Sequence, residues 1–577
     1  MNHNIELLLI KKTNTVREAM VAITRAGREG LPVGIILVVD SARRLCGTVT
    51  DGDIRKALVS GVSMDAYVID IMSRDPITVQ TGLDVDNMIK TVRAKAIASG
   101  RIRDTKVDKV VVTDEENCVV DVIDFSELWY KQEIWRREVC VIGVGHVGLT
   151  LAVVLADLGF HVAGVDVRDE YIGSLKEGRA GFYEKGLEPL LRFHLKRNNL
   201  KFTTKICDVD ANVFIIAVGT PVDGQTNKAN NDFIKKAALD LGKVLKKEDL
   251  VIMRSTVTVG TTRNAVLPIL EKESGLQAGK DFYLVFAPER VVEGNAIEEI
   301  KTIPQIVGGI NRRSVQEATG ILQTISPSVI ILDSLEAAEM VKLINNTYRD
   351  YSFAFANKVA LLCEELGLDS VKLIKAASEG YSRNPVPLPS PGVGGYCLTK
   401  DPYLMAEVAT NNNQDPAIFL QSRKINDEMP QFIAKKISSF LVKNNGKTKE
   451  IKVYIVGFAF KGYPETSDMR GSPAVDVLNL LSAKFDGQLD LYGYDPVIKP
   501  RALERINVKF AAFKEGFVDA HAVLIMNNHP DFMKMDIYNL VDSMRKPSIF
   551  FDGWQIFSPQ EIAKIVGVSY QGLGGQH

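Results

Sequence analysis

The stretch from Val139 to Asp166 constrains the fold of this chain more than any other segment. Residues 139–142 have the composition of a short buried strand, and an apolar helical stretch follows the glycine turn Gly143-Val144-Gly145-His146-Val147-Gly148. Glycines in a GxGxxG pattern between a strand and a helix allow a tight turn and a close approach of backbone N–H groups to a pyrophosphate. The helix N-terminus adds a dipole that favours negative charge. We therefore predict a parallel α/β sheet in which residues 143–148 bind a dinucleotide.

A second predicted strand favours NAD as this dinucleotide. It covers residues 162–166 and ends in Asp166, about 20 residues after the first glycine, where an acid accepts hydrogen bonds from ribose hydroxyls. Its carboxylate would repel the 2′-phosphate of NADP, although Arg168 follows closely and leaves NADP open. Two later strands end in polar residues, and the carboxyl ends of parallel strands line the ligand crevice. We expect further cofactor contacts from Gly219, Thr220, Pro221, Ser255 and Thr256.

A chain of 577 residues is too long for one hydrophobic core, and its patterns divide it into four regions. Residues 1–132 carry two similar α+β units, and residues 138–333 alternate strands with helices. Residues 334–446 are mostly helical and contain a glycine-rich cysteine loop, and residues 447–577 return to alternation. Such alternation is typical of doubly wound sheets. The prediction is an α/β protein with two Rossmann-like doubly wound domains joined by a helical central domain, and an α+β pair before them.

The two N-terminal units repeat the order short strand, helix, two strands, closing helix. The first contains GTVTDGDIRKAL at residues 47–58, and the second contains a diverged counterpart, VVDVIDFSEL, at residues 119–128. This repeat resembles a CBS-domain pair, a module that often binds adenine nucleotides or related effectors. The resemblance implies a regulatory module for such a nucleotide. A pair without a ligand, serving as an oligomerisation platform, is the alternative.

Composition excludes several other classes of protein. The net charge of −1 leaves no excess of Lys and Arg for a nucleic-acid partner. The N-terminus lacks the basic start and apolar run of a signal peptide, and the apolar stretch 139–165 fits a buried strand–helix–strand better than a membrane span. Six scattered cysteines without a CxxC pair indicate reduced thiols and no metal site. We expect a cytoplasmic protein with no membrane partner.

Three segments carry residues suited to catalysis. Pro391-Gly392-Val393-Gly394-Gly395 precedes Cys397, which we place at the start of a helical turn, where its thiol pKa would be lowered. Asp401 follows four residues later. Lys342 and Asn346 share one face of an apolar helix and could stabilise an oxyanion. Glu289 and Glu293 lie just past a predicted strand end.

Together these segments resemble the UDP-glucose/GDP-mannose dehydrogenase family. The motifs are GVGHVGL, STVTVGT, APERVVEG, EAAEMVKLINNTYRD, PGVGGYCLTKDPY and VGFAFKGYPETSDMRGSP, in the family's order. The resemblance implies a four-electron oxidation of the C6 hydroxyl of a nucleotide sugar to a uronic acid, with NAD as the oxidant. Cys397 would hold the intermediates as a thiohemiacetal and then a thioester. Further catalytic roles are implied for the oxyanion pair Lys342 and Asn346, the acid/base Asp401, the proton-handling Glu289, and Thr256, which positions water and cofactor.

The resemblance also implies a substrate site and an oligomer. The wording of two motifs favours UDP-N-acetylhexosamines, and the long helix from residue 334 suits a homodimer or larger homo-oligomer in which Arg383 serves the neighbouring site. Tyr171, Thr399 and Lys400 depart from residues common in the family. Arg470 and Glu293 would contact the cofactor. The implied substrate contacts are Glu289, Arg290, Val291, Val292, Glu293, Lys342, Asn346, Arg383, Pro391, Gly392, Val393, Gly394, Gly395 and Lys461.

Two alternatives remain open from the residues. A two-electron dehydrogenase of the 6-phosphogluconate type has the same Rossmann and helical layout but needs no nucleophilic cysteine. A CBS-regulated nucleotide sensor would bind without turnover, although retention of Cys397, Lys342, Asn346 and Asp401 argues against lost activity.

Overall fold

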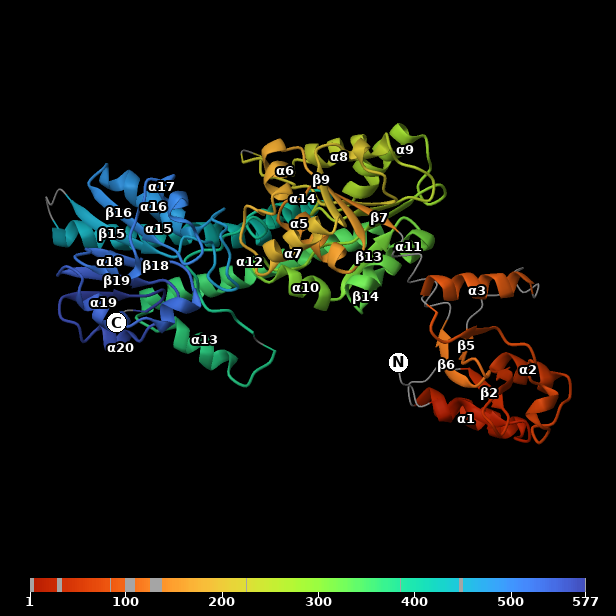
Figure 1. The fold of residues 1–577 in the computed structure, drawn as a ribbon. Coiled ribbons are helices and arrows are strands. Elements are labelled where there is room, and N and C mark those ends of the chain that lie inside the picture. Colours follow the sequence, from red (N-terminus) through yellow and green to blue (C-terminus); the bar gives the residue numbers. More distant parts are fainter. Residues whose placement is uncertain are drawn as a thin grey trace. The chain divides into compact units, whose positions relative to one another are not determined.

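The chain divides into two compact units, Met1–Arg136 and Arg137–His577 (Figure 1). The computed structural model describes residues 5–28, 34–83, 85–98, 109–124, 137–224, 226–383, 385–445 and 450–575.

The first unit contains two three-stranded sheets with the same pattern. In each sheet the first strand is parallel to the second, and the second is antiparallel to the third. This confirms the internal repeat, although the closing helix expected in the second repeat lies outside the described residues. The elements of the first repeat are β1 (Leu9–Lys11), α1 (Val16–Arg28), β2 (Ile35–Val39), β3 (Leu45–Thr50) and α2 (Asp51–Val59). Those of the second are β4 (Thr78–Gln80), α3 (Val85–Ala98), β5 (Lys109–Thr113) and β6 (Val119–Asp124).

The second unit begins with an eight-stranded sheet of order β14-β13-β12-β11-β10-β7-β8-β9. Strand β7 (Glu138–Ile142) pairs with β8 and β10, so the strand order reverses beside it and a ligand crevice opens at its carboxyl end. All neighbours are parallel except β12 and β13. The strands are β8 (His161–Val165), β9 (Leu200–Thr203), β10 (Val213–Ile216), β11 (Leu250–Met253), β12 (Tyr283–Phe286), β13 (Gln305–Gly309) and β14 (Val329–Leu332). The main helices are α5 (His146–Asp157), α6 (Asp169–Lys176), α7 (Leu187–Lys196), α8 (Asp232–Gly242), α9 (Leu267–Ser274), α10 (Ala296–Thr302) and α11 (Arg312–Ile325).

Four helices form the middle of this unit. The longest, α12 (Leu335–Leu366), starts where the Ser334 hydroxyl accepts a hydrogen bond from the Ala337 N–H, and it ends at Gly367, which has φ of 68°. In Figure 1, α12 runs between the two large sheets of the unit. The others are α13 (Ser370–Ser378), α14 (Asp401–Asn411) and α15 (Ala417–Asn445).

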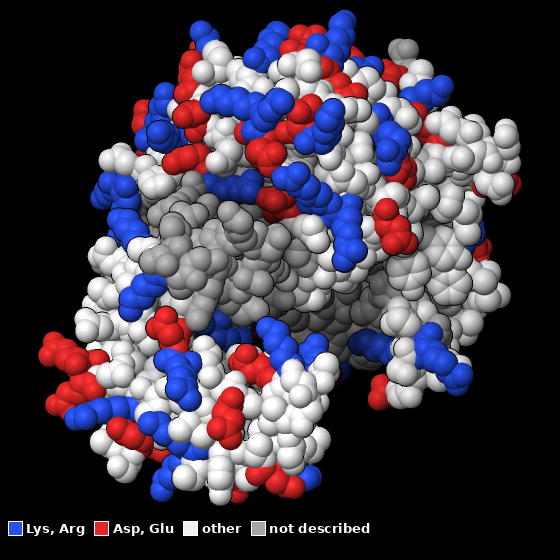
Figure 2. Space-filling view, turned by 90° about the vertical axis from the view of Figure 1, so that its right-hand side faces the viewer, with Lys and Arg blue, Asp and Glu red and all other residues white. Residues whose placement is uncertain are grey.

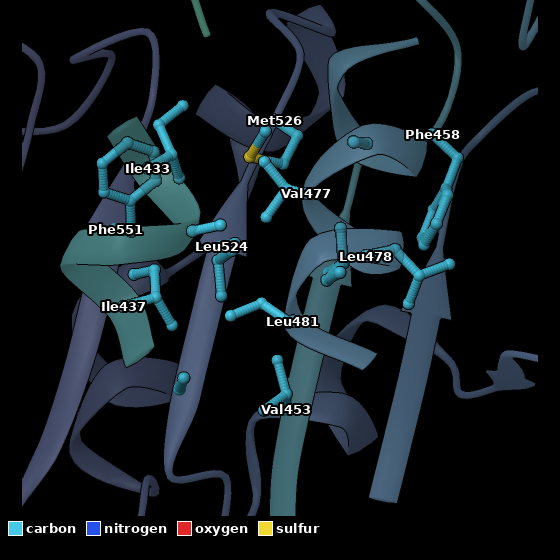
Figure 3. Packing of buried hydrophobic residues seen from close by; sticks show 14 of the residues in the cluster. Ile433, Ile437, Val453, Phe458, Val477, Leu478, Leu481, Leu524, Met526 and Phe551 are labelled. Atoms are coloured by element: carbon cyan, nitrogen blue, oxygen red, sulfur yellow. The ribbon is translucent and has the colours of Figure 1, made fainter. Parts of the chain in front are cut away.

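The last sheet has six parallel strands in the order β17-β16-β15-β18-β19-β20. Figure 3 shows how Ile433 and Ile437 of α15 pack beside Val477 and Leu481 of α16 (Pro473–Phe485) on one face of this sheet, as part of a buried apolar cluster. The strands are β15 (Ile451–Val456), β16 (Leu489–Tyr494), β17 (Lys509–Phe510), β18 (Ala522–Ile525), β19 (Ser548–Asp552) and β20 (Val568–Gln571). The helices are α16 (Pro473–Phe485), α17 (Pro500–Glu504), α18 (Phe513–Phe517), α19 (Ile537–Asp542) and α20 (Pro559–Ile562).

The fold class predicted from the sequence is therefore confirmed: two doubly wound sheets flank a helical centre. On the face in view in Figure 2, Lys and Arg side chains are interspersed with Asp and Glu side chains, in keeping with the net charge of −1.

Candidate active site

The three glycines of the first turn serve two purposes: Gly143 and Gly148 allow close packing, and Gly145 leaves room for a ligand. A side chain at Gly143, which has φ of 89°, would come within 2.8 Å of the Val218 backbone, and one at Gly148 within 1.9 Å of the Gly143 carbonyl oxygen. Both positions therefore need glycine for packing. No atom of the described part of the chain lies within 4 Å of the position where Gly145 would carry a Cβ. Gly145, the residue before α5, is thus where a phosphate group can approach the backbone.

A cavity of 780 Å³ extends from this turn along the ends of β7, β8 and β10. Asp166 at its wall accepts two side-chain hydrogen bonds from Arg168, from Nε at 2.8 Å and from Nη2 at 2.9 Å. This pairing raises the pKa of Arg168. The guanidinium also lies 4.3 Å from the centre of the Tyr171 ring, whose hydroxyl donates to the Val144 carbonyl at 2.9 Å. Of the predicted cofactor residues, this cavity is lined by Gly143, Gly145, Asp166, Arg168, Gly219 and Pro221.

A second cavity, of 310 Å³, adjoins the first, since Gly145, Ala217, Val218, Gly219 and Tyr396 line both. It brings together predicted residues from segments far apart in the sequence. They are Gly145, His146, Val147, Gly219, Thr220, Ser255, Thr256, Glu289, Val291, Glu293, Lys342, Cys397 and Arg470.

Cys397 lies at the start of a helical turn, as expected from the sequence. It lies in a turn four residues before α14, and its carbonyl accepts hydrogen bonds from the Lys400 N–H at 3.3 Å and the Asp401 N–H at 3.0 Å. Burial raises the pKa of Cys397, whereas the charges of Lys342 and Lys400 oppose this effect. The expectation of a lowered pKa was wrong because it considered the local turn and not the burial of the sulfur.

Asp401 is completely buried and lies between two donors. Asn346 Nδ2 donates to its Oδ2 at 2.5 Å, and Lys400 Nζ donates to its Oδ1 at 2.5 Å. Lys400 itself lines the second cavity, and its ammonium lies 5.5 Å from the centre of the Tyr396 ring. The pKa of Lys400 is raised, because the neighbouring carboxylate and thiol outweigh the opposing effect of burial. Sequence analysis treated Lys400 only as a departure from the family, although its place beside Asp401 was a usable signal.

Glu289 forms a buried ion pair that the sequence analysis missed. Arg254, which follows β11, donates to Glu289 Oε2 from Nε at 3.1 Å and from Nη2 at 2.5 Å. The other carboxylate oxygen accepts the Arg290 N–H at 2.8 Å. Both Arg254 and Glu289 line the second cavity. The signal for Arg254 was its position at a strand end, directly before Ser255 and Thr256.

Glu293 is the centre of a second charged cluster. Its backbone carbonyl accepts a hydrogen bond from Lys461 Nζ at 2.6 Å, and Arg470 Nη2 lies 3.7 Å from its carboxylate. Burial, reinforced by Asp468, raises the pKa of Glu293 to about 7, although Arg470 and Lys461 oppose the shift. Burial lowers the pKa of Lys461 to about 8, against the effect of Glu293.

His146 lies against this cluster as a neutral ring. Its centre is 3.7 Å from that of Phe182, and its Nδ1 is 3.9 Å from a Glu293 carboxylate oxygen. Burial lowers the pKa of His146 to about 4. His146 therefore lines the second cavity as an uncharged ring at neutral pH.

The glycines before Cys397 are needed for packing inside the protein. A Cβ at Gly394 would lie 2.3 Å from the Gly471 carbonyl oxygen, and one at Gly395 would lie 2.7 Å from the Phe460 ring. Gly395 N–H also donates to the Arg470 carbonyl at 3.0 Å.

Other predicted site residues also line neither of the two cavities. Arg383 is exposed in the turn after α13, with its guanidinium 4.9 Å from the centre of the Tyr381 ring. Arg290 donates a side-chain hydrogen bond to the Pro304 carbonyl. The predicted residues outside both linings are Val144, Gly148, Arg290, Val292, Asn346, Arg383, Pro391, Gly392, Val393, Gly394, Gly395, Asp401 and Lys461.

The residues around the glycine turn fit a dinucleotide. Thr220 is buried at the wall of the second cavity, and its hydroxyl has no hydrogen-bond partner among the residues that the structure describes. The Thr220 hydroxyl and the open space at Gly145 are therefore both available to a polar ligand. Among the described residues, no group of three His, Cys, Asp or Glu side chains is arranged to hold a metal ion. Within the same residues, no helix has both the length and the apolar character to cross a bilayer.

Family models match the chain in four places. Residues 137–326, 336–428 and 454–559 match the NAD binding, central and UDP binding domains of the UDP-glucose/GDP-mannose dehydrogenase family. Residues 1–60 match a CBS domain. This last match covers the first of the two repeats described above.

Two related enzymes align with this chain over nearly their whole length. A UDP-N-acetyl-D-mannosamine dehydrogenase of Pyrococcus horikoshii is 33% identical over 439 residues, which are 76% of this chain and 99% of the relative. One of Campylobacter jejuni is 32% identical, over 69% of this chain and 97% of the relative.

Solved structures show the same likeness. The UDP-D-ManNAc dehydrogenase structure from Pyrococcus horikoshii has a TM-score of 0.68 at 31% identity, covering 76% of this chain and 99% of that one. A UDP-glucose dehydrogenase from Pyrobaculum islandicum has a TM-score of 0.66 at 25% identity, covering 76% and 98%. The chain therefore belongs to the UDP-glucose/GDP-mannose dehydrogenase family and is an NAD-binding nucleotide-sugar dehydrogenase.

Proposed function

We propose that this enzyme oxidises the C6 hydroxyl of a UDP-N-acetylhexosamine to the uronic acid in two steps, with Cys397 as the covalent nucleophile. The observation that carries the proposal is the second cavity, in which Cys397 and Lys342 adjoin the glycine turn. The relatives named UDP-N-acetyl-D-mannosamine dehydrogenase support the sugar class. When bound, NAD accepts a hydride from the substrate carbon in each of the two oxidations.

In the first step the C6 hydroxyl becomes an aldehyde. Lys400 lines the cavity and donates to buried Asp401, so it can take up the hydroxyl proton while passing one of its own to that carboxylate. The ammonium of Lys342 stabilises negative charge that develops on the substrate oxygen. Asn346 holds the other oxygen of Asp401 and so fixes the orientation of the acid.

In the second step the Cys397 sulfur adds to the aldehyde carbon. The S–C bond forms as the carbonyl π bond breaks, and the thiol proton ends on the oxygen, giving a thiohemiacetal. Loss of the carbon-bound hydride to the oxidant and of the hydroxyl proton to the protein leaves a thioester. Water then adds to the thioester and the C–S bond breaks, so that one water proton restores the thiol, the other passes to the protein, and the carboxylate leaves. Glu289, held by Arg254, and Thr256 line the cavity where this water must be oriented.

We propose in addition that α12 forms a homodimer interface. One side of the helix carries the buried Lys342, Asn346 and Asp350. The opposite side exposes the large apolar residues Ile344, Tyr348, Tyr351, Phe355, Leu362 and Leu366. An exposed apolar stripe of this length marks a protein interface. Light scattering on the wild type and on Phe355→Glu tests this, and a wild-type monomer would contradict it.

The reaction is tested by incubating the enzyme with NAD and a panel of UDP- and GDP-sugars, with NADH and product mass both measured. Two NADH per sugar and a uronic acid support the proposal. One NADH per sugar with a keto product supports the two-electron alternative. Binding without NADH formation across the panel supports the nucleotide-sensor alternative.

A further inference from the structure

A buried arginine lies behind the cysteine loop, outside both cavities. Arg423 of α15 has a side chain that is 1% exposed, and its ionic partner Asp350 of α12 is 0% exposed. Burying a charged pair is costly unless its hydrogen bonds are satisfied. The contacts of Arg423 show how this cost is met.

The guanidinium holds both ends of the segment that contains Cys397. Nη2 donates to the Val393 carbonyl at 3.0 Å, and Nη1 donates to the Leu398 carbonyl at 3.3 Å. Residues 394–397 lie between these two carbonyls. Nη1 also donates to Asp350 at 2.6 Å, and Nε donates to Asp427 at 3.0 Å. The rigid fork of an arginine side chain suits such a set of diverging acceptors.

The same network reaches the helix that carries the oxyanion pair. Asp350 is two helical turns beyond Lys342, on the same face of α12, and also accepts from Asn426 Nδ2 at 2.9 Å. Asn357, further along α12, donates to Asn426 Oδ1 at 2.9 Å and accepts the Ser390 N–H at 2.8 Å. The buried face of α12 therefore contacts Asp401 through Asn346, and it contacts Ser390, directly before the cysteine loop, through Asn357.

We infer that Arg423, through Asp350, is a positioning residue that fixes the Cys397 sulfur relative to Lys342. The groups whose charges act on the thiol include Lys342, Asp401, Lys400, Glu293 and Arg470. Arg423 is bonded to the backbone of the loop, so it acts on the position of the sulfur. The inference rests on the proposed function, because placement of the sulfur matters only if Cys397 adds to the aldehyde.

The step served by this placement is the addition of the thiol across the aldehyde C=O, and the first oxidation does not need it. A displacement of about 1 Å in a reacting group can cost about 10²-fold in rate. A disturbed loop should therefore slow uronate formation and leave formation of the aldehyde and substrate affinity close to normal. A purely structural role would lower stability and affect both oxidations alike.

The test compares Arg423→Lys with Lys436→Gln in the full-length enzyme. Lysine keeps the charge opposite Asp350 but cannot reach both loop carbonyls. Lys436 makes an ion pair with Glu364 at 2.6 Å that joins the same two helices without touching the cysteine loop, so its variant is a matched control. Three quantities are measured: alkylation of Cys397 by iodoacetamide against pH, followed on its peptide by mass spectrometry; the ratio of trapped aldehyde to uronate; and KM.

We expect Arg423→Lys to slow uronate formation by about 10- to 100-fold, to raise the fraction of aldehyde, and to change the alkylation profile at a KM close to wild type. Lys436→Gln should match the wild type in all three. If Arg423→Lys gives the same alkylation and product ratio as Lys436→Gln, the inference is overturned. Uronate formation by Cys397→Ser would instead overturn the proposed function itself, so the two failures are distinguishable.

A second variant covers the case in which Arg423→Lys does not fold. Asp427 has a side chain that is 54% exposed and accepts from Arg423, so Asp427→Asn loosens the same guanidinium at little cost in stability. It should shift the alkylation rate and the product ratio in the same direction, by a smaller factor. Wild-type values in Asp427→Asn would overturn the inference.

Discussion

Asn346 donates a hydrogen bond of 2.5 Å to Asp401, which lies 55 residues away in sequence. Both side chains are buried, and neither lines the second cavity, which Cys397 lines. We therefore expect Asn346 to orient this acid, whereas the family resemblance implies that it stabilises an oxyanion directly. The first prediction separates these two roles.

Asn346→Ala should lower kcat for uronate by about 10- to 100-fold, since Asp401 loses the donor that fixes one of its oxygens. Leaving a buried carboxylate oxygen unsatisfied should also cost about 1–3 kcal/mol of stability. Steady-state kinetics and urea unfolding measure the two effects. Asn345→Ala, on the same helix but outside both cavity linings, is the control. An Asn346→Ala enzyme with wild-type kcat would show that the orientation of Asp401 is irrelevant to turnover.

Cys397→Ser should abolish uronate formation while nucleotide-sugar binding persists, because the serine hydroxyl is a far weaker nucleophile toward the aldehyde. Product mass and calorimetric binding check the two halves of this prediction. Cys46→Ser, in the N-terminal unit, should turn over normally. Full uronate production by the Cys397 variant would remove the covalent mechanism.

The buried carboxyl of Glu293 gives a prediction about stability and pH. Its pKa is raised to about 7, so between its unfolded value and that pH the folded state binds more protons, and stability falls as pH rises through this range. Glu293→Gln mimics the protonated carboxyl. The wild type should therefore lose stability relative to Glu293→Gln between pH 5 and pH 8, although Lys461 loses a neighbouring carboxylate in the variant. Urea unfolding at both pH values measures the free energies of unfolding of the two proteins. A wild type that gains stability relative to Glu293→Gln as pH rises contradicts the raised pKa.

Much of the fold was predictable because its signals are local. The strand before Gly143, the glycine turn and the acid at the end of the next strand all lie within one βαβ unit, and the structure confirms the sheet they predicted. Periodicity likewise placed Lys342 and Asn346 on one face of a helix. These features depend on residues that are close together in the sequence, so one sequence is enough to reveal them.

The site was less predictable because its energetics depend on contacts across the sequence. The thiol pKa of Cys397 is raised by burial, which no local pattern reported. Arg254 and Arg423 acquire their roles only from carboxylates that are 35 and 73 residues away. The family resemblance implied that the glycines at 394 and 395 contact the substrate, but the structure packs them against Gly471 and Phe460. The sequence shows these glycines, and only the fold shows which groups approach them.

Cofactor choice should depend on the Asp166–Arg168 pair. The Asp166 carboxylate should repel a 2′-phosphate, and it accepts hydrogen bonds from the guanidinium of Arg168. Asp166→Ser removes the repulsion and frees the guanidinium, which can then pair with the phosphate. The ratio of kcat/KM for NADP to that for NAD should rise by at least about tenfold, which corresponds to about 1.4 kcal/mol. The double variant with Arg168→Ala should lose most of the gain. An unchanged ratio in Asp166→Ser would place cofactor selection elsewhere.

The N-terminal unit should control the enzyme without taking part in its chemistry. The relative from Pyrococcus horikoshii is covered over 99% of its length by 76% of this chain, and residues 137–577 form a compact unit by themselves. Removing residues 1–136 should therefore leave kcat for the sugar close to that of the full chain. If the CBS module binds an adenine nucleotide, the full chain should change its activity or its melting temperature on addition of ATP or AMP, and the truncated enzyme should not. Equal responses of both proteins would make the module a scaffold, and loss of uronate formation on truncation would mean that the catalytic unit depends on it.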